Sequence, residues 1–213
     1  FKFMQWRPGR VCGVNARIMR ISFSGELAYE INVEANYGRF IWDQVALAGK
    51  PWKITPYGTE SMHVLRAEKG YIIVGQDTDG SMTPMDVNMN WILAKDKPFS
   101  YIGRRSFSIA ALNSSDRLQL VGLLTKDSQV VLPEGAHIIS NQGISIGYVT
   151  SSYYSSALGR SIALAQLKGG LSMMSETVLV KIVQEKQGLK EIPCEVSGSV
   201  FYDVKGEKVD GNE

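Results

Sequence analysis

The chain has 213 residues, enough for one large domain or two ordinary ones, and its 44% apolar and 21% charged residues are typical of a globular protein. A net charge of +2 is too small to indicate a nucleic-acid-binding surface. Cys12 and Cys194 lie far apart and outside any CxxC pattern, which argues against a disulfide framework or structural zinc and suits a reducing cytoplasm. No run reaches the roughly 18 apolar residues that span a bilayer.

The chain starts with FKFMQW and not with a methionine, so we expect it to be a piece of a longer polypeptide. Its first clear pattern predicts a β-hairpin. Residues 14–23 are extended, Ser24-Gly25-Glu26 form a turn, and apolar residues alternate with small or polar ones over 27–33. Glu30 lies on the face opposite the apolar one. It is either an ordinary solvated glutamate or a carboxylate that faces a ligand.

Two helices are predicted next. Asn36 offers an N-cap for an amphipathic helix that ends before Gly49 and Pro51. A second helix is predicted from about Gly58 onward, with Gly70 at the C′ position that follows a helix.

Shorter elements follow the second helix. Residues 71–74 are apolar and predict a short strand, and residues 75–84 are dense in Gly, Asp, Ser and Thr and predict a loop. A short helix is predicted over about 103–112. Residues 113–116, Asn-Ser-Ser-Asp, are the best candidate linker.

From Arg117 onward, apolar and β-branched runs recur between Gly-rich or polar turns. The runs read LQLVGLL, AHIIS, ISIGYVTS, SIALAQL, TVLVKIV and EIPCEVS. Several short strands with almost no helical periodicity predict a small antiparallel barrel or sandwich. The predicted fold class is therefore α+β, with an α+β domain over residues 1–113 and an all-β domain over residues 114–213.

Common catalytic and cofactor motifs are not found in the sequence. No GxGxxG follows a predicted strand, and neither GxxxxGK[ST] nor GxSxG occurs. The two histidines, His63 and His137, fall in different predicted domains, so a catalytic triad is not supported. The DTDG at residues 77–80 is similar to half of a calcium loop, but the first and twelfth ligand positions would fall on Gly75 and Asp86. We expect a structural loop in which aspartates cap backbone amides.

Aromatic residues gather in the first half of the chain. They are Tyr29, Trp42, Trp52, Tyr57, Tyr71 and Trp91. A flat heterocyclic ligand needs stacking faces and a carboxylate that accepts paired N–H bonds. We expect most of these rings to be core, and Trp91 to be the exception, because it follows the loop and lies beside Asn90.

Five motifs follow one another with natural spacing. They are SGELAYEINV, YGTESMHVLRAEKGYIIVGQDTDG, TPMDVNMNWILAKDKPFSYIGRRS, GYVTSSYYSSALGRSIALAQL and VFYDVKGEKVDG. Together they resemble the folate-binding aminomethyltransferase family, which includes the glycine-cleavage T-protein. The MHVLRAEKG and GRSIALA segments are most similar to the C-terminal part of the α subunits of heterotetrameric sarcosine oxidases.

The resemblance implies a partial folate-binding α+β domain followed by a small Greek-key-like β-barrel. The family's pteridine-binding glutamate is the second one of a GE-x-x-[YF]-E pattern. It falls on Glu30, with Tyr29 before it, and its carboxylate can accept two parallel N–H bonds from the aminopyrimidine edge. The family's tryptophan beside the folate falls on Trp91.

The resemblance also has departures. Where T-proteins carry an arginine early in the second helix, this chain has Met62, and Arg66, one turn later on the same face, is expected to supply the charge. The family's catalytic aspartate would precede Phe1, as would the flavin- and NAD-related parts of sarcosine oxidase α subunits. We therefore expect tetrahydrofolate as the cofactor and no catalytic residue in this chain. The expected folate-binding residues are Tyr29, Glu30, Arg66 and Trp91.

Two classes of function are consistent with the resemblance. In the first, the chain is part of a sarcosine oxidase, or of an aminomethyltransferase, that captures a one-carbon unit as 5,10-methylenetetrahydrofolate. In the second, the fold is a non-catalytic module for subunit assembly, with Glu30 an ordinary surface residue. The expected partners are folate and other sarcosine oxidase subunits, and neither nucleic acid nor a membrane is expected.

Overall fold

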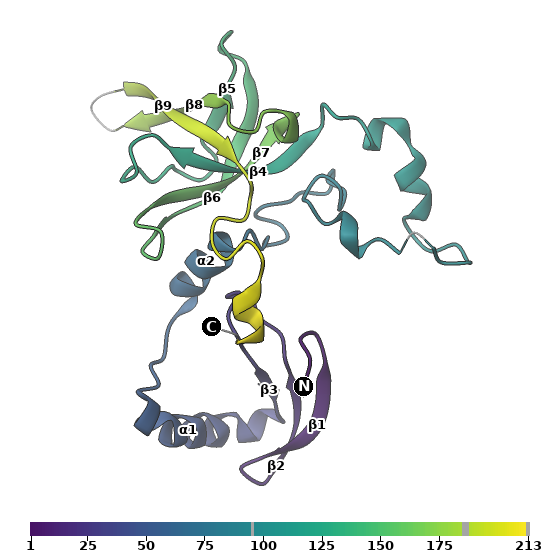
Figure 1. The fold of residues 1–213 in the computed structure, drawn as a ribbon, viewed down its shortest axis with the longest axis vertical. Coiled ribbons are helices and arrows are strands. Elements are labelled where there is room, and N and C mark those ends of the chain that lie inside the picture. Colours follow the sequence, from purple (N-terminus) through teal and green to yellow (C-terminus); the bar gives the residue numbers. More distant parts are fainter. Residues whose placement is uncertain (95, 185–187, 212–213) are drawn as a thin grey trace. The chain divides into compact units, whose positions relative to one another are not determined.

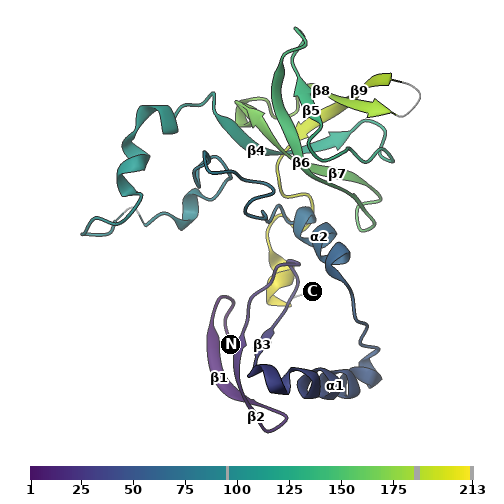
Figure 2. The ribbon, with the colours of Figure 1, turned by 180° about the vertical axis from the view of Figure 1, so that it is seen from behind.

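The computed structural model describes residues 1–94, 96–184 and 188–211, and the chain forms two compact units. The first unit comprises Phe1–Arg66 and Asp203–Glu213, and the second comprises Ala67–Tyr202. Figure 1 labels the elements of both units, and Figure 2 shows them from behind. The mixed α and β composition and the closed barrel confirm the predicted fold class.

A three-stranded antiparallel sheet opens the first unit, in the order β1-β2-β3 (Figure 1). Its strands are β1 (Trp6–Val11), β2 (Val14–Met19) and β3 (Glu30–Asn32). The predicted hairpin is confirmed as the pairing of β2 with β3, but the strands are shorter than predicted and residues 20–29 connect them. Leu27 and Tyr29 are 45% and 51% exposed, so the apolar alternation lacks the buried face that would extend the strand.

Strand β1 is not predicted by the sequence pattern. It joins β2 through Cys12 and Gly13, whose φ angles of 49° and 82° both lie in the left-handed region. Two consecutive positive φ angles are what the tightest hairpin turn requires. Pro8 is tolerated because β1 is an edge strand, and its exposed, non-alternating residues hide the strand from a search for periodicity.

Helix α1 (Gly38–Gly49) confirms the first predicted helix, flanked by the 3-10 helices η1 (Ala35–Tyr37) and η2 (Lys50–Trp52). The predicted cap is wrong: Asn36 lies inside η1, and Tyr37 holds the N-cap position without a side-chain hydrogen bond. Within α1, Ile41 is the buried residue, so most of the apolar face of the helix is open.

The C-terminal segment belongs to the first unit and contains the 3-10 helix η7 (Glu207–Asp210). Arg20, just after β2, holds it there. Its Nη2 donates to the carbonyl oxygen of Val209 at 3.0 Å and to Oδ1 of Asp210 at 3.1 Å. Two chain segments almost 190 residues apart are thus joined by one guanidinium.

Helix α2 (Thr59–Glu68) confirms the second predicted helix, and Gly70 follows it with a φ of 67°. The Gly70 amide donates to the carbonyl of Ala67 at 3.0 Å, as a helix-ending glycine should. A Cβ at this position would lie 2.5 Å from the Ser199 carbonyl oxygen, so the close approach of the 199 backbone also requires glycine.

The predicted strand over residues 71–74 is wrong. The Ile73 carbonyl accepts from the amides of Gln76 and Asp77, and the Ile73 amide donates to the Asp77 carboxylate at 2.8 Å. These bonds close a turn and leave no backbone ladder to form. Val74 is 84% exposed.

The closed antiparallel barrel contains every strand predicted after Arg117, in the order β4-β7-β6-β5-β8-β9. Its strands are β4 (Leu118–Thr125), β5 (His137–Ile139), β6 (Ser145–Ser155), β7 (Arg160–Lys168), β8 (Thr177–Gln184) and β9 (Gly188–Ser197). Val121, Val149 and Val180 are fully buried in its core. Segments before the barrel pack on a second cluster that includes Ala67, Val87 and Leu120.

The second unit also contains short 3-10 helices: η3 (Asn90–Ile92), η4 (Arg104–Ser108), η5 (Ala110–Leu112) and η6 (Gly170–Ser172). The single helix predicted over 103–112 is therefore wrong in type. Ile109 is extended, with ψ 121°, and separates η4 from η5.

Candidate functional site

Glu30 is the first residue of β3 and lies opposite Met19 of β2 in the ladder. The backbone register fixes the position of its Cα, while its side chain is exposed. A carboxylate on a strand, open to solvent, can accept hydrogen bonds from a ligand without losing a structural partner that the sheet needs. The predicted accessible position of Glu30 is therefore found in the structure.

Tyr29 precedes the strand and contacts another aromatic ring. Its ring centre lies 5.9 Å from that of Phe1, with the planes tilted by 51°. Phe1 also contacts Arg7, whose guanidinium carbon lies 4.6 Å from the centre of the Phe1 ring. Tyr29, at 51% exposure, therefore belongs to a small aromatic and cationic cluster next to Glu30.

Arg66 is placed differently from the expected role. It lies in the last turn of α2 and is fully buried. A buried guanidinium is costly to desolvate and is usually held by the fold. The helical spacing predicts which face Arg66 shares with Met62, but it does not show what covers that face. In this structure Arg66 presents no surface to a ligand.

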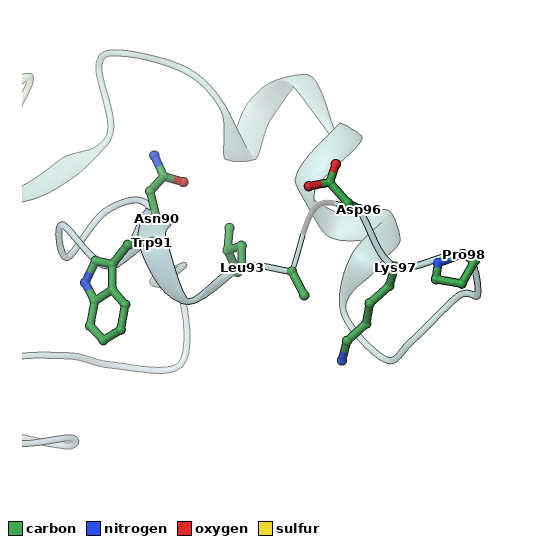
Figure 3. Close-up of a pocket in the computed structure, with 7 residues that line it drawn as sticks. Asn90, Trp91, Leu93, Asp96, Lys97 and Pro98 are labelled. Atoms are coloured by element: carbon green, nitrogen blue, oxygen red, sulfur yellow. The ribbon is translucent and has the colours of Figure 1, made fainter. Parts of the chain in front are cut away.

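Trp91 lies in η3 and is 77% exposed. It lines an open pocket of about 570 Å³ together with Asn90, Leu93, Ala94, Asp96, Lys97 and Pro98. In Figure 3, the indole and the Lys97 side chain point to one side of the chain, whereas the side chains of Asn90 and Asp96 point to the other. The exposed ring agrees with the expectation that Trp91 is not a core residue. The expectation that most of the other rings are core is wrong, because four of them are exposed as well: Tyr29, Trp42, Trp52 and Tyr57.

The segment that leads to Trp91 is bound to the barrel. The Leu120 amide donates to the carbonyl of Asp86 at 2.7 Å, and Asn88 Nδ2 donates to the Leu120 carbonyl at 2.9 Å. Arg117 adds an ion pair with the Asp86 carboxylate, which also accepts from the amide and hydroxyl of Thr83. These bonds fix the chain three residues before Trp91.

The electrostatics of Asp86 reflect these contacts. Burial by itself would raise the pKa of this carboxyl, but the hydrogen bonds from Arg117 and Thr83 outweigh burial and lower the pKa below its ordinary value. The same pair raises the pKa of Arg117. The pair is therefore fully ionised at neutral pH.

The aspartates of the predicted loop accept hydrogen bonds that hold the fold. Asp77 is fully buried and accepts from Thr150 Oγ1 at 2.6 Å and Ser151 Oγ at 2.7 Å. Asp79 is exposed and accepts from the Ser81 amide at 2.8 Å and its hydroxyl at 2.6 Å, and these bonds lower its pKa. The prediction that these aspartates cap backbone amides is confirmed.

Within the described residues, no group of three or more His, Cys, Asp or Glu is arranged to hold a metal ion. No helix in the described ranges is long and apolar enough to cross a membrane.

Cys12 and Cys194 are both free thiols, and burial raises the pKa of Cys194 to about 12, so this thiol stays protonated.

Two models of one protein family match most of the chain. Residues 1–97 match the GCVT N-terminal domain, and residues 119–203 match the Glycine cleavage T-protein C-terminal barrel domain. The chain belongs to the glycine cleavage T-protein family. The barrel of β4–β9 is thus the family's C-terminal barrel domain, and both Glu30 and Trp91 lie within the N-terminal match.

Relatives of this T-protein family chain include sarcosine oxidase subunits and aminomethyltransferases. It is 44% identical over 219 residues to sarcosine oxidase subunit alpha of Corynebacterium sp. (strain P-1), covering 99% of this chain and 22% of that protein. It is 37% identical to the subunit of the same name in Rhizobium meliloti, over 90% of this chain and 20% of the relative. An aminomethyltransferase of Streptomyces avermitilis is 31% identical over 77% of this chain and 44% of its own length.

A solved structure shows the same fold. The glycine cleavage system aminomethyltransferase T from Bartonella henselae superposes with a TM-score of 0.82 at 22% identity, over 95% of this chain and 53% of that chain. The chain thus spans about a fifth of the length of the sarcosine oxidase relatives and about half of this T-protein.

The T-protein family residues named from the sequence are distributed over both units. Tyr29 and Glu30 are neighbours in the first unit, where Arg66 is also found, and Trp91 lies in the second. Lys97, which shares the Trp91 pocket, is missed by the sequence reasoning, although its place six residues after the tryptophan in a polar stretch was an available signal.

Proposed function

We propose that this chain is the tetrahydrofolate-binding part of a sarcosine oxidase α subunit. It holds tetrahydrofolate while the one-carbon unit from oxidative demethylation of sarcosine is captured as 5,10-methylenetetrahydrofolate. The observation that carries the proposal is the 44% identity to a sarcosine oxidase subunit alpha over 99% of this chain. A cytoplasmic location is part of the same proposal.

The side chains present are chemically suited to this cofactor. The aminopyrimidine edge of a pteridine offers adjacent N–H donors, and Glu30 provides an exposed carboxylate that can accept both. A flat ring system also needs an apolar wall, and Trp91 offers an indole that is 77% exposed in a pocket of about 570 Å³. Tyr29 adds a partly exposed ring beside Glu30.

The chain's own contribution is to bind and to orient. When bound, tetrahydrofolate supplies two amine nitrogens, with which formaldehyde forms two C–N bonds while its oxygen leaves as water. Glu30 fixes the direction of the pteridine through charge-assisted hydrogen bonds, and Trp91 offers an apolar surface against which an aromatic ring of the folate packs. We assign no catalytic residue to this chain.

A second candidate function is subunit assembly, and exposed apolar residues favour it. Trp42 and Trp52 are 61% and 86% exposed. Trp42, Ile54 and Tyr57 line an apolar pocket of about 480 Å³ in the first unit. Large exposed apolar surfaces commonly mark protein interfaces, and the sarcosine oxidase relatives are named as subunits.

Tetrahydrofolate titration separates the two candidates. We expect Trp91→Leu, made in the natural polypeptide that contains this chain, to weaken tetrahydrofolate binding about tenfold, which is about 1.4 kcal/mol. Trp52→Leu should leave that affinity unchanged. Failure of the unmodified protein to bind tetrahydrofolate would refute the proposed function. Loss of subunit association in Trp52→Leu alone would instead support the assembly role.

Capture of the one-carbon unit needs its own measurement. With sarcosine as substrate and tetrahydrofolate present, the unmodified protein should form 5,10-methylenetetrahydrofolate in place of free formaldehyde. Release of all the formaldehyde to solution, despite bound tetrahydrofolate, would contradict capture while leaving folate binding intact.

A further inference from the structure

Lys97 is a charged residue of the Trp91 pocket for which the sequence gives no role. It lines the pocket with Trp91, and in Figure 3 both side chains extend to the same side of the chain. An indole and an ammonium group therefore line the same pocket from one side of the chain. This pairing is typical of sites for ligands that join an aromatic ring to an anionic group.

The position of the ammonium group is restrained by aromatic rings. Lys97 Nζ lies 5.9 Å from the ring centre of Phe99 and 5.2 Å from that of Tyr101. A cation held near two ring faces explores fewer positions than a freely solvated lysine, which reduces the entropy lost when an anion binds.

The loop that carries Lys97 is also held. Arg104 Nη1 donates to the carbonyl of Lys97 at 3.0 Å and to that of Phe99 at 2.9 Å. The Tyr101 hydroxyl donates to the Ala94 carbonyl at 3.2 Å. These contacts hold the carbonyls of Ala94, Lys97 and Phe99 to the side chains of Tyr101 and Arg104, so the backbone at Lys97 has a defined partner.

The charges around the pocket favour an anion on the Lys97 side. Asp96 is the acidic residue that lines this pocket, and its carboxylate points away from the side on which Lys97 and Trp91 lie (Figure 3). Arg104, in the adjoining pocket, adds a second positive charge near the same loop. A carboxylate next to Lys97 would be attracted by its ammonium group.

We propose that Lys97 is a specificity-determining residue that binds a carboxylate of the glutamyl end of the folate, while Trp91 packs against the neighbouring aromatic ring. This inference rests on the proposed function. The pteridine end of the cofactor has no carboxylate and is assigned to Glu30, whereas the other end is an aromatic ring followed by a glutamate. Added glutamates extend the negative charge and should strengthen the contact with Lys97.

The test compares ligands with and without the anionic end. Tetrahydrofolate, its triglutamate and a tetrahydropterin without the benzoylglutamate group are titrated against the natural polypeptide, its Lys97→Met variant and its Lys97→Arg variant. We expect Lys97→Met to weaken tetrahydrofolate binding about threefold to tenfold, the range of a solvent-accessible ion pair with a restrained cation, and triglutamate binding by at least as much. Tetrahydropterin binding should not change, and Lys97→Arg should restore most of the affinity.

The control is Lys126→Met, because Lys126 is an exposed lysine of the second unit that follows the barrel strand β4. It should change no affinity. Tetrahydrofolate affinity should fall with added salt in the unmodified protein and less steeply in Lys97→Met. Unchanged tetrahydrofolate binding in Lys97→Met, or an equal loss for the tetrahydropterin, would overturn the role of Lys97 while folate binding stands. Absence of binding by the unmodified protein would refute the proposed function itself.

Discussion

The guanidinium of Arg117 forms a two-point ion pair with the carboxylate of Asp86, with Nε 2.9 Å from Oδ1 and Nη2 2.8 Å from Oδ2. Asp86 is only 4% exposed, and Arg117 immediately precedes the first barrel strand, β4. The pair therefore attaches the segment before Trp91 to the barrel.

Removing the cation of this pair should destabilise the protein. Arg117→Met leaves the buried Asp86 carboxylate without its main partner, and we expect a loss of about 3 kcal/mol in the free energy of unfolding. Urea unfolding followed by circular dichroism measures it. The matched control is Arg39→Met, because Arg39 pairs with Asp43 on the exposed surface of α1 and its side chain is 86% exposed. Equal losses in the two variants would contradict the structural role of Arg117.

The same pair predicts a pH dependence. Because the pKa of Asp86 is lowered in the folded state, the stability it contributes is fully present above the ordinary carboxyl pKa of about 4 and is lost as the pH falls through the folded value. The difference in unfolding free energy between the unmodified protein and Asp86→Asn should therefore be constant from pH 7 to about 5 and shrink below about 4. A difference that stays constant down to pH 3 would disagree with this assignment.

The barrel could be predicted from the sequence because its strands are apolar runs whose partners all lie within the same unit. Residues 71–74 show the limit of that reasoning. Their composition favours a strand. In the structure, however, the Ile73 amide donates to the Asp77 carboxylate and the Ile73 carbonyl accepts from the amides of residues 76 and 77, which closes a turn. Strand β1 shows the opposite error, since the left-handed Cys12-Gly13 turn specifies a hairpin that no hydrophobic alternation reveals.

The buried carboxylate of Asp77 should anchor the loop that follows it. Asp77→Ala leaves the hydroxyls of Thr150 and Ser151 without this acceptor, and we expect a loss of about 3 kcal/mol. Limited proteolysis should then cut within residues 75–84 faster than in the unmodified protein. Asp79→Ala, which removes an exposed cap from the same loop, is the control and should have a much smaller effect on global stability. Unchanged cleavage in Asp77→Ala would argue against the anchor.

Substitution of two glycines tests how closely strands β6 and β7 of the barrel approach each other. A Cβ at Gly147 of β6 would collide with the backbone carbonyl oxygen of Gln166 in β7, whereas a Cβ at Gly198 would meet no atom within 4 Å. We expect Gly147→Ala to lower the melting temperature, with a loss of about 2 kcal/mol, and Gly198→Ala to be close to neutral. Differential scanning calorimetry measures both. Similar melting temperatures for the two variants would show that the strands separate more easily than the structure indicates.

The candidate site was predictable in part. The alternation over residues 27–33 places Glu30 on the face away from the apolar residues, and its side chain is exposed in the structure. The spacing around Arg66 gives its helix face but not its burial, because burial depends on segments distant in sequence. The six-residue spacing between Trp91 and Lys97 is visible in the sequence, but the pocket that they share depends on the conformation of residues 90–94 and 96–98, which has no sequence periodicity.

The central claim is that Glu30 binds the pteridine of tetrahydrofolate, and the most direct test is the dissociation constant of tetrahydrofolate for Glu30→Gln beside Glu26→Gln. Glu26 is also exposed and lies four residues earlier in the same motif, so the two substitutions remove the same charge from neighbouring positions. Loss of a charge-assisted hydrogen-bond pair should weaken binding about tenfold to a hundredfold in Glu30→Gln and leave Glu26→Gln unchanged. Equal affinity in both variants and the unmodified protein would contradict the account.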